Sequence, residues 1–199
     1  MFTHHLSRFK QAVYTIHPGE YLVSEDDVII ATVLGSCISV ALWDHRLLMG
    51  GINHFMLPGD LDDKDLVKSR NAKYGMFAME LLYNELLKRG SRRLDISAKV
   101  FGGSSVLNLP GASRAIPKGN IDFAFAYLEK ESIPILASDT GGELPRKILF
   151  FAKTGKVLLK RIGGKVLREV EREEIAYLKR IVAEPQGVVV LFGKGNEKP

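Results

Sequence analysis

The segment from residue 28 to residue 43 reads VIIATVLGSCISVALW. Apolar and β-branched residues fill 28–33 and 38–43, a composition that favours two buried strands. Gly35 and Ser36 interrupt the apolar pattern, as loop residues do. Cys37, the single cysteine of the chain, follows the break directly. The segment therefore predicts a strand, a sharp turn that exposes a cysteine, and a second strand.

Residues 48–55 predict a further strand, joined to 38–43 by a short polar turn at 44–46. With a two-residue turn, the register of this hairpin places Cys37 directly opposite His54. Directly opposed side chains share a face of the sheet, with Cβ atoms about 4.5–5.5 Å apart. A bulge at the two glycines of the second strand would shift this register by one residue.

Helical spacing is clearest from residue 71 to residue 89, where Gly90 follows as a stop signal. A second helix is expected from a cap at Asn120 to about residue 130. Strands dominate the rest, so an α/β sandwich is the expected class. The remaining predicted elements are strands at 21–23, 94–101, 133–137, 147–152, 156–161 and 187–192 and a helix at 171–182.

The chain has 199 residues, of which 46% are hydrophobic, as in one globular domain over 1–199 with an N-terminal arm at 1–15. It has no apolar run of about 20 residues and no secretory signal. A single cysteine excludes an internal disulfide, which fits a cytoplasmic protein. The formal net charge of +5 favours acidic partners but is too small to indicate nucleic acid.

A thiol beside an imidazole can act as a nucleophile, because the histidine favours the thiolate and then serves as acid and base. Backbone N–H groups at the turn before Cys37 can supply an oxyanion hole. Competing readings are weaker: Ser36 lacks a nucleophile-elbow motif, and Gly102-Gly103 lacks the lysine of a phosphate loop. No histidine motif indicates a metal, so neither a metal nor a cofactor is expected.

The run TVLGSC at 32–37, followed by GGINHFMLP at 50–58, resembles the CheD family of chemoreceptor glutamine deamidases. Further matches lie at 18–21, 73–74, 98–103, 139–142, 146–147 and 154–155. The resemblance extends over about residues 16–165, and the region from about 170 to 199 falls outside it. It implies a three-layer α/β sandwich with mixed sheets, two main helices and a Cys-His-Thr triad.

By this resemblance, Cys37 is the nucleophile, His54 the acid and base, and Thr32 the residue that orients His54. In some members the threonine stands one position earlier, where this chain has Ala31. The residues expected to bind the substrate amide are Gly35, Ser36, Gly102 and Gly103.

The implied reaction converts receptor glutamine to glutamate and releases ammonia. The implied partners are the cytoplasmic domains of methyl-accepting chemotaxis receptors and, as in some members, the phosphatase CheC. Basic side chains at Arg146, Lys147, Lys160 and Arg161 are candidates for receptor contact. Two alternatives stay open: another cysteine amidase or thioesterase, and a non-catalytic regulator of a chemotaxis phosphatase.

Overall fold

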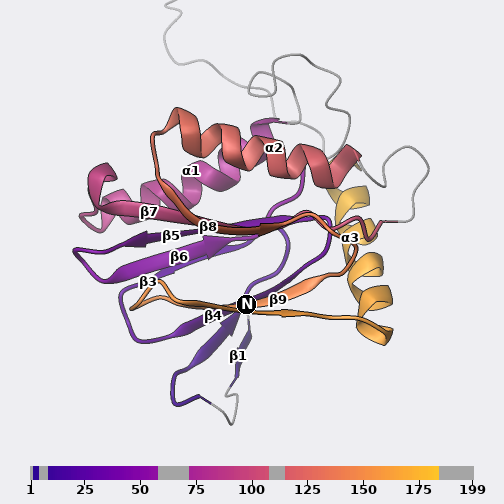
Figure 1. The fold of residues 1–199 in the computed structure, drawn as a ribbon, viewed down its shortest axis with the longest axis horizontal. Coiled ribbons are helices and arrows are strands. Elements are labelled where there is room, and N and C mark those ends of the chain that lie inside the picture. Colours follow the sequence, from indigo (N-terminus) through magenta and orange to yellow (C-terminus); the bar gives the residue numbers. More distant parts are fainter. Residues whose placement is uncertain (1, 5–8, 58–71, 108–114, 184–199) are drawn as a thin grey trace, which may run out of the picture.

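The computed structural model describes residues 2–4, 9–57, 72–107 and 115–183 (Figure 1). Two five-stranded sheets lie face to face, and two helices cover the outer face of one of them. The expected three-layer α/β sandwich is therefore confirmed. Among the described residues, no helix has both the length and the apolar character needed to cross a membrane.

The first sheet has the order β1-β2-β4-β9-β10, with β2 parallel to β4 and the other pairs antiparallel. Its strands are β1 (Phe2–His4), β2 (Val13–Thr15), β4 (Ile29–Leu34), β9 (Arg146–Phe151) and β10 (Val157–Arg161). The predicted N-terminal arm thus includes two strands of this sheet.

The second sheet has the order β3-β6-β5-β7-β8, with β7 and β8 parallel and the other pairs antiparallel. Its strands are β3 (Tyr21–Ser24), β6 (Met49–Asn53), β5 (Ile38–Asp44), β7 (Ile96–Gly102) and β8 (Ile135–Thr140). A short 3-10 helix at Arg93–Asp95 leads into β7. The polypeptide passes from the first sheet to the second at residues 35–37, between β4 and β5.

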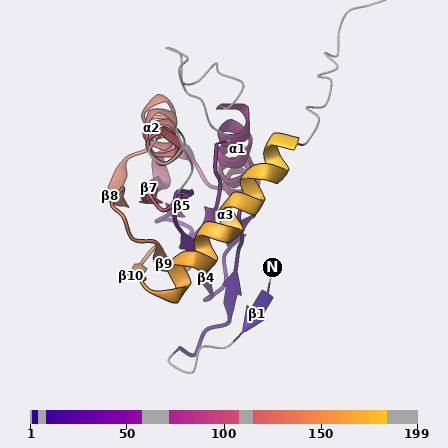
Figure 2. The same ribbon diagram turned by 90° about the vertical axis from the view of Figure 1, so that its right-hand side faces the viewer.

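Helices α1 (Ala72–Lys88) and α2 (Ala115–Lys130) pack on the second sheet through one apolar core. A second core lies between the sheets, where Ile30 and Ile148 meet Ala41 and Ile52. Helix α3 (Lys165–Ala183) belongs to none of the three layers. It crosses the ends of the strands at one side of the sandwich (Figure 2).

The β5–β6 hairpin has a longer turn than predicted. Asp44 is opposite Met49, so residues 45–48 form the turn. The Oδ1 atom of Asp44 accepts the N–H groups of Arg46 and Leu47, and Leu48 takes a left-handed φ of 51°. This side-chain-capped turn adds two residues that hydrophobic alternation alone did not reveal.

The prediction that Cys37 lies directly opposite His54 is therefore wrong. A bridge between Ile38 and Phe55 continues the observed register past the end of the ladder. Because the shift is two residues, each side chain keeps its face of the sheet. Cys37 and His54 become diagonal neighbours on one face, which is still within reach of a thiol and an imidazole.

Two other expectations need correction or fall outside the described residues. Asn120 is not a helix cap, because α2 begins at Ala115 and Asn120 is fully buried within it. The predicted strand at 187–192 lies outside the described residues.

Candidate active site

The loop Gly35-Ser36-Cys37 has all three of its carbonyl groups held by the body of the protein. Ser104 N–H donates to the Gly35 carbonyl over 2.6 Å, and Gly103 N–H donates to the Cys37 carbonyl over 2.7 Å. The Ser36 carbonyl accepts from Nδ2 of Asn120 over 2.8 Å. The N–H groups of Gly35, Ser36 and Cys37 point to the opposite side of the loop.

Those three N–H groups all point at one carboxylate on α3. Gly35 and Cys37 donate to Oε1 of Glu174 over 3.0 and 3.1 Å. Ser36 donates to Oε2 from its N–H over 2.9 Å and from its hydroxyl over 2.6 Å. Successive N–H groups that converge on one point form an anion-binding nest. Gly35 suits this place because a Cβ there would lie 2.9 Å from Glu174 Oε2 and 2.5 Å from Val106.

The thiol and the imidazole of the predicted pair lie at this nest. Cys37 Sγ, a ring nitrogen of His54 and a carboxylate oxygen of Glu174 are all within 4.8 Å of one another. All three side chains are buried, with exposed fractions of 0%, 3% and 2%. The site is therefore closed to solvent in this structure.

Thr32 determines which nitrogen of His54 carries the proton. The Thr32 hydroxyl donates to the Ile16 carbonyl over 2.9 Å and lies 2.8 Å from His54 Nδ1. A hydroxyl has one hydrogen, so the Nδ1–H of His54 must be the donor in the second contact. His54 Nε2 is then an unprotonated acceptor, and it is buried with no hydrogen-bond partner among the described residues. The imidazole is oriented as a base.

The surroundings of Cys37 and His54 both favour the uncharged forms of these groups. Burial and, to a smaller extent, the field of His17 lower the pKa of His54 to about 3. Burial raises the pKa of the Cys37 thiol well above its usual value, and the carboxylate of Glu174 adds to that effect. The thiolate–imidazolium pair expected from the sequence is thus disfavoured here, because the two side chains are buried and a carboxylate lies beside them.

Cysteine, histidine and glutamate are also metal ligands, so the same three side chains could be read as a metal site. Both oxygens of Glu174, however, already face N–H and O–H donors. Such donors serve an anion, since a cation would be repelled by the positive ends of the same N–H dipoles. The arrangement fits the binding of a carboxylate or an amide better than the binding of a metal.

The expected substrate-binding residues fall into two groups. Gly35 and Ser36 supply donors to the nest, while Gly102 and Gly103 lie behind the loop. A Cβ at Gly102, where φ is 117°, would lie 2.2 Å from the Cys37 carbonyl oxygen. Gly102 thus lets the end of β7 approach the loop closely, whereas a Cβ at Gly103 would lie 2.5 Å from Ile121 of α2. The Gly103 N–H donates to that same Cys37 carbonyl.

Sequence reasoning missed two residues of the site. Asn120 bridges two segments, donating to the Ser36 carbonyl and accepting the Leu57 N–H over 2.7 Å. Glu174 is separated from the loop by more than 130 residues of sequence. A polar residue at a buried position of an amphipathic helix is the signal that could have identified Glu174.

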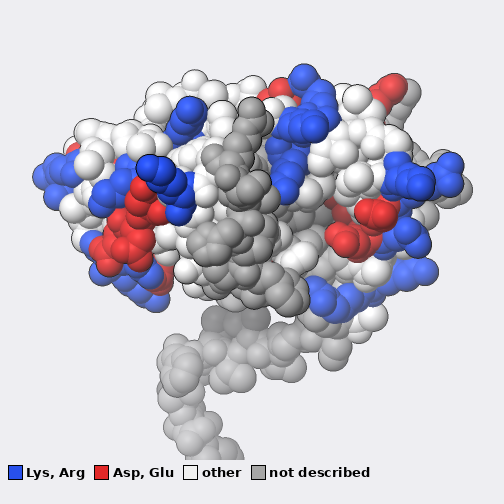
Figure 3. All heavy atoms as spheres, turned by 90° about the horizontal axis from the view of Figure 1, so that it is seen from below, with Lys and Arg blue, Asp and Glu red and all other residues white. Residues whose placement is uncertain are grey.

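The predicted basic contact surface also changes. Arg146 is 1% exposed and bonds to Ser104, Gly141 and Asp139, so it belongs to the interior. Arg161 is exposed but pairs with Asp139. Seen from below, the Lys and Arg side chains lie in separate groups with Asp and Glu among them (Figure 3). The face has no continuous basic surface among the described residues.

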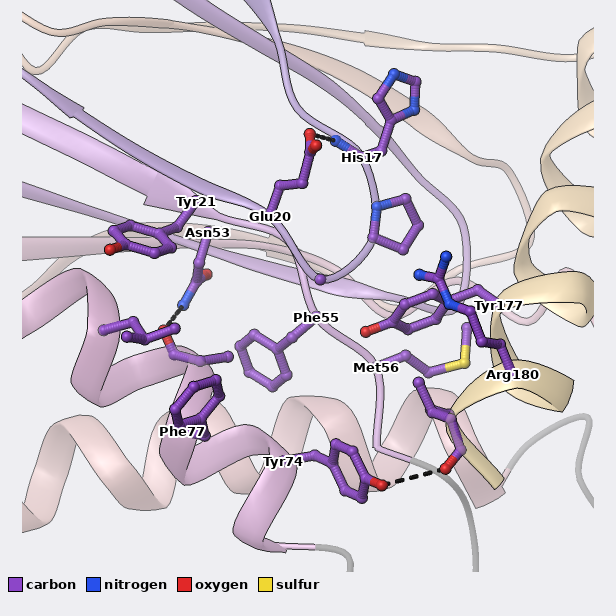
Figure 4. A pocket seen from close by; sticks show the side chains of 15 residues that line it. His17, Glu20, Tyr21, Asn53, Phe55, Met56, Tyr74, Phe77, Tyr177 and Arg180 are labelled. Carbon is purple, nitrogen blue, oxygen red and sulfur yellow. Dashed lines mark hydrogen bonds between the residues drawn. The ribbon is translucent and has the colours of Figure 1, made fainter. Parts of the chain in front are cut away.

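A pocket of about 420 Å³ lies beside the buried pair, between β3, α1 and α3. Phe55 and Met56, which follow His54, form part of its lining, and Tyr74 and Phe77 line it from α1 (Figure 4). Tyr177 and Arg180 form the α3 side. The pocket is mostly apolar with a few polar groups, as binding sites commonly are.

A buried cysteine beside an oriented histidine and a nest of N–H donors provides the groups that hydrolysis of an amide through a cysteine nucleophile requires. The family model described as CheD chemotactic sensory transduction matches residues 56–161. Curated relatives named "Probable chemoreceptor glutamine deamidase CheD" extend the similarity over nearly the whole chain. The chain belongs to the CheD family.

Three of these relatives illustrate the extent of the match. The protein from Laribacter hongkongensis is 41% identical over 92% of this chain and 89% of its own length. The "CheD 1" protein from Shewanella oneidensis is 42% identical over 94% and 90%. That from Xanthomonas euvesicatoria is 43% identical over 94% and 92%. An aligned stretch of that length must include α3, which sequence analysis placed outside the resemblance.

Proposed function

We propose that this chain hydrolyses glutamine side chains of chemotaxis receptors to glutamate and ammonia, with Cys37 as nucleophile and His54 as acid and base. The named activity of the relatives gives the reaction. The observation that carries the proposal is the convergence of the three N–H groups of residues 35–37 beside the Cys37 thiol. The phosphatase CheC and a cytoplasmic location stay predictions.

The first half of the reaction forms a thioester. His54 Nε2 takes the thiol proton, and the Cys37 sulfur attacks the side-chain carbonyl carbon of the glutamine. The developing oxyanion takes the position of Glu174 Oε1, where the N–H groups of Gly35 and Cys37 stabilise it. The carbon–nitrogen bond breaks as His54 returns the proton to the departing nitrogen, which leaves as ammonia.

The second half restores the enzyme. His54 Nε2 takes a proton from a water molecule, which attacks the thioester carbonyl carbon. The carbon–sulfur bond breaks, the sulfur leaves, and the proton returns to it from His54. The product is glutamic acid, which loses its remaining proton to water and becomes a carboxylate whose two oxygens suit the donors of Gly35, Ser36 and Cys37. Thr32 acts throughout by keeping the Nδ1–H of His54 engaged.

Mass spectrometry of a receptor cytoplasmic domain tests this function. The full chain should convert particular receptor glutamines to glutamate. Each conversion should add one dalton to the receptor and release one molecule of ammonia. Cys37→Ala should remove the conversion, and free glutamine should be a much poorer substrate, because a single amide offers little binding energy. Conversion that survives Cys37→Ala would contradict the proposal. Efficient use of free glutamine would favour a general amidase.

A further inference from the structure

The side chain that fills the nest has the chemical form of the reaction product. Glu174 places a glutamate carboxylate beside Cys37 and His54, on a helix of the same chain. We propose that α3 is a product-mimicking autoinhibitory helix, and that a receptor helix bearing glutamine takes its place during turnover. This inference rests on the proposed function, because Glu174 mimics the product only if the enzyme converts glutamine to glutamate. The occlusion of Cys37 by α3 can be measured independently of that function.

The buried face of α3 is built around a charge. Only Val170, Glu174 and Ile181 of this helix are buried, and their spacing places them along one side. An ordinary helix packs apolar residues at the centre of such a face, because an unpaired buried carboxylate is costly. Here the central residue is a glutamate whose partners are all residues of the catalytic loop.

The contacts on either side of Glu174 hold the helix over the site. A Cβ at Gly35 would lie 2.9 Å from Val170, one turn before Glu174. Near the other end, the Tyr74 hydroxyl of α1 donates to the Ile181 carbonyl over 3.1 Å (Figure 4). With α3 in this position Cys37 is 0% exposed, so no receptor side chain can reach the thiol.

The space for a receptor helix adjoins the same position. Tyr177 and Arg180 project from α3 toward Met56 and form one wall of the apolar pocket (Figure 4). When α3 departs, that wall is removed, and the pocket joins the groove that α3 has left. A helix presenting glutamine at the place of Glu174 fits there, because α3 itself shows that the site accepts a side chain of that length from a helix.

The docked helix also suppresses the chemistry. Burial and the Glu174 carboxylate both raise the pKa of the Cys37 thiol. Departure of α3 admits water and removes the negative charge, and both changes favour the thiolate. Docking therefore blocks the site and lowers the reactivity of the nucleophile together.

The substitution Glu174→Ala tests the inference, with Glu173→Ala as its matched control. Glu173 is exposed on the same helix and has the same charge. Cys37 is the only cysteine, so alkylation by iodoacetamide, followed by mass spectrometry of the full chain, reports on this thiol alone. Glu174→Ala should speed alkylation roughly tenfold or more, since reactivity scales with the fraction of open molecules. Glu173→Ala should react like the wild type.

Receptor turnover is the second readout. Glu174→Ala should increase receptor deamidation, again by roughly tenfold or more, if docking limits access. Val170→Asp, which disturbs the docking without altering the carboxylate, should act in the same direction. The inference would be overturned if Glu174→Ala and Val170→Asp were alkylated at the wild-type rate. It would also be overturned if both of these variants turned over receptor more slowly than an active wild type. Faster alkylation with no glutamate formed would instead contradict the proposed function and leave the occlusion established.

Discussion

The loop at residues 35–37 and helix α3 meet at one carboxylate but are held in place differently. The loop has its carbonyls fixed by Gly103, Ser104 and Asn120, which belong to the body of the protein. Helix α3 is attached through the contacts of Glu174 with the loop and through Ile175, Tyr177 and Leu178, which pack against the core between the sheets. The N–H donors of residues 35–37 are therefore positioned without help from α3. A catalytic nest that is fixed by the sandwich can exchange one occupant for another.

Loss of the nucleophile or the base should have the largest effect on this fixed site. In a Glu174→Ala background, Cys37→Ala and His54→Ala should each reduce receptor deamidation by about a thousandfold or more. The double variant should lose little beyond either single variant, because the two groups act as a unit. Steady-state ammonia release measures this. Losses that multiply in the double variant would show that the pair does not cooperate.

Asn120→Ala should weaken the support of the loop. It leaves the Ser36 carbonyl and the Leu57 N–H buried without partners, which costs about 2–4 kcal/mol of unfolding free energy. Denaturant-induced unfolding measures this cost. Asn84→Ala, an exposed position on α1, is the control and should change stability by less than about 0.5 kcal/mol. Equal losses of stability at the two positions would show that Asn120 does not support the loop.

Thr32→Val should lower the turnover number of the open enzyme by about 10- to 150-fold. It removes the acceptor of the His54 Nδ1–H, a bond worth about 1.5–3 kcal/mol once the imidazole becomes charged in the reaction. Thr32→Ser keeps the hydroxyl and should restore most of the rate. If serine fails to rescue while the fold is intact, the hydroxyl is not what orients His54.

A further effect is expected on stability at acid pH. His54 has a folded pKa of about 3, below its unfolded value of 6.5, so the unfolded state binds the proton first as pH falls. Stability from this group is therefore lost from about pH 6.5 downward, at up to about 1.4 kcal/mol per pH unit. Unfolding titrations of wild type and His54→Gln should differ in slope between pH 6.5 and pH 4. Parallel curves would contradict the burial of a neutral imidazole.

Local patterns predicted most of the sandwich, because strand alternation and helix stop signals are properties of neighbouring residues. They also predicted that Cys37 and His54 share a face, although Asp44 lengthened the turn and shifted the register by two. Asn120 was misassigned because its partners, Ser36 and Leu57, are distant in sequence. Glu174 was missed for the same reason: a pattern within α3 cannot reveal which donors meet its carboxylate.

The most direct test of the account uses α3 as a substrate. In Glu174→Gln, the carboxylate is replaced by the amide that the enzyme is proposed to hydrolyse, at the position where Glu174 now lies beside Cys37. Mass spectrometry of the tryptic peptide 173–179 should show the amide returning to the acid, with a gain of one dalton. The same peptide from a Cys37→Ala, Glu174→Gln protein should keep the amide. An amide that persists in a preparation that converts receptor glutamine, or one that is lost without Cys37, would contradict the account.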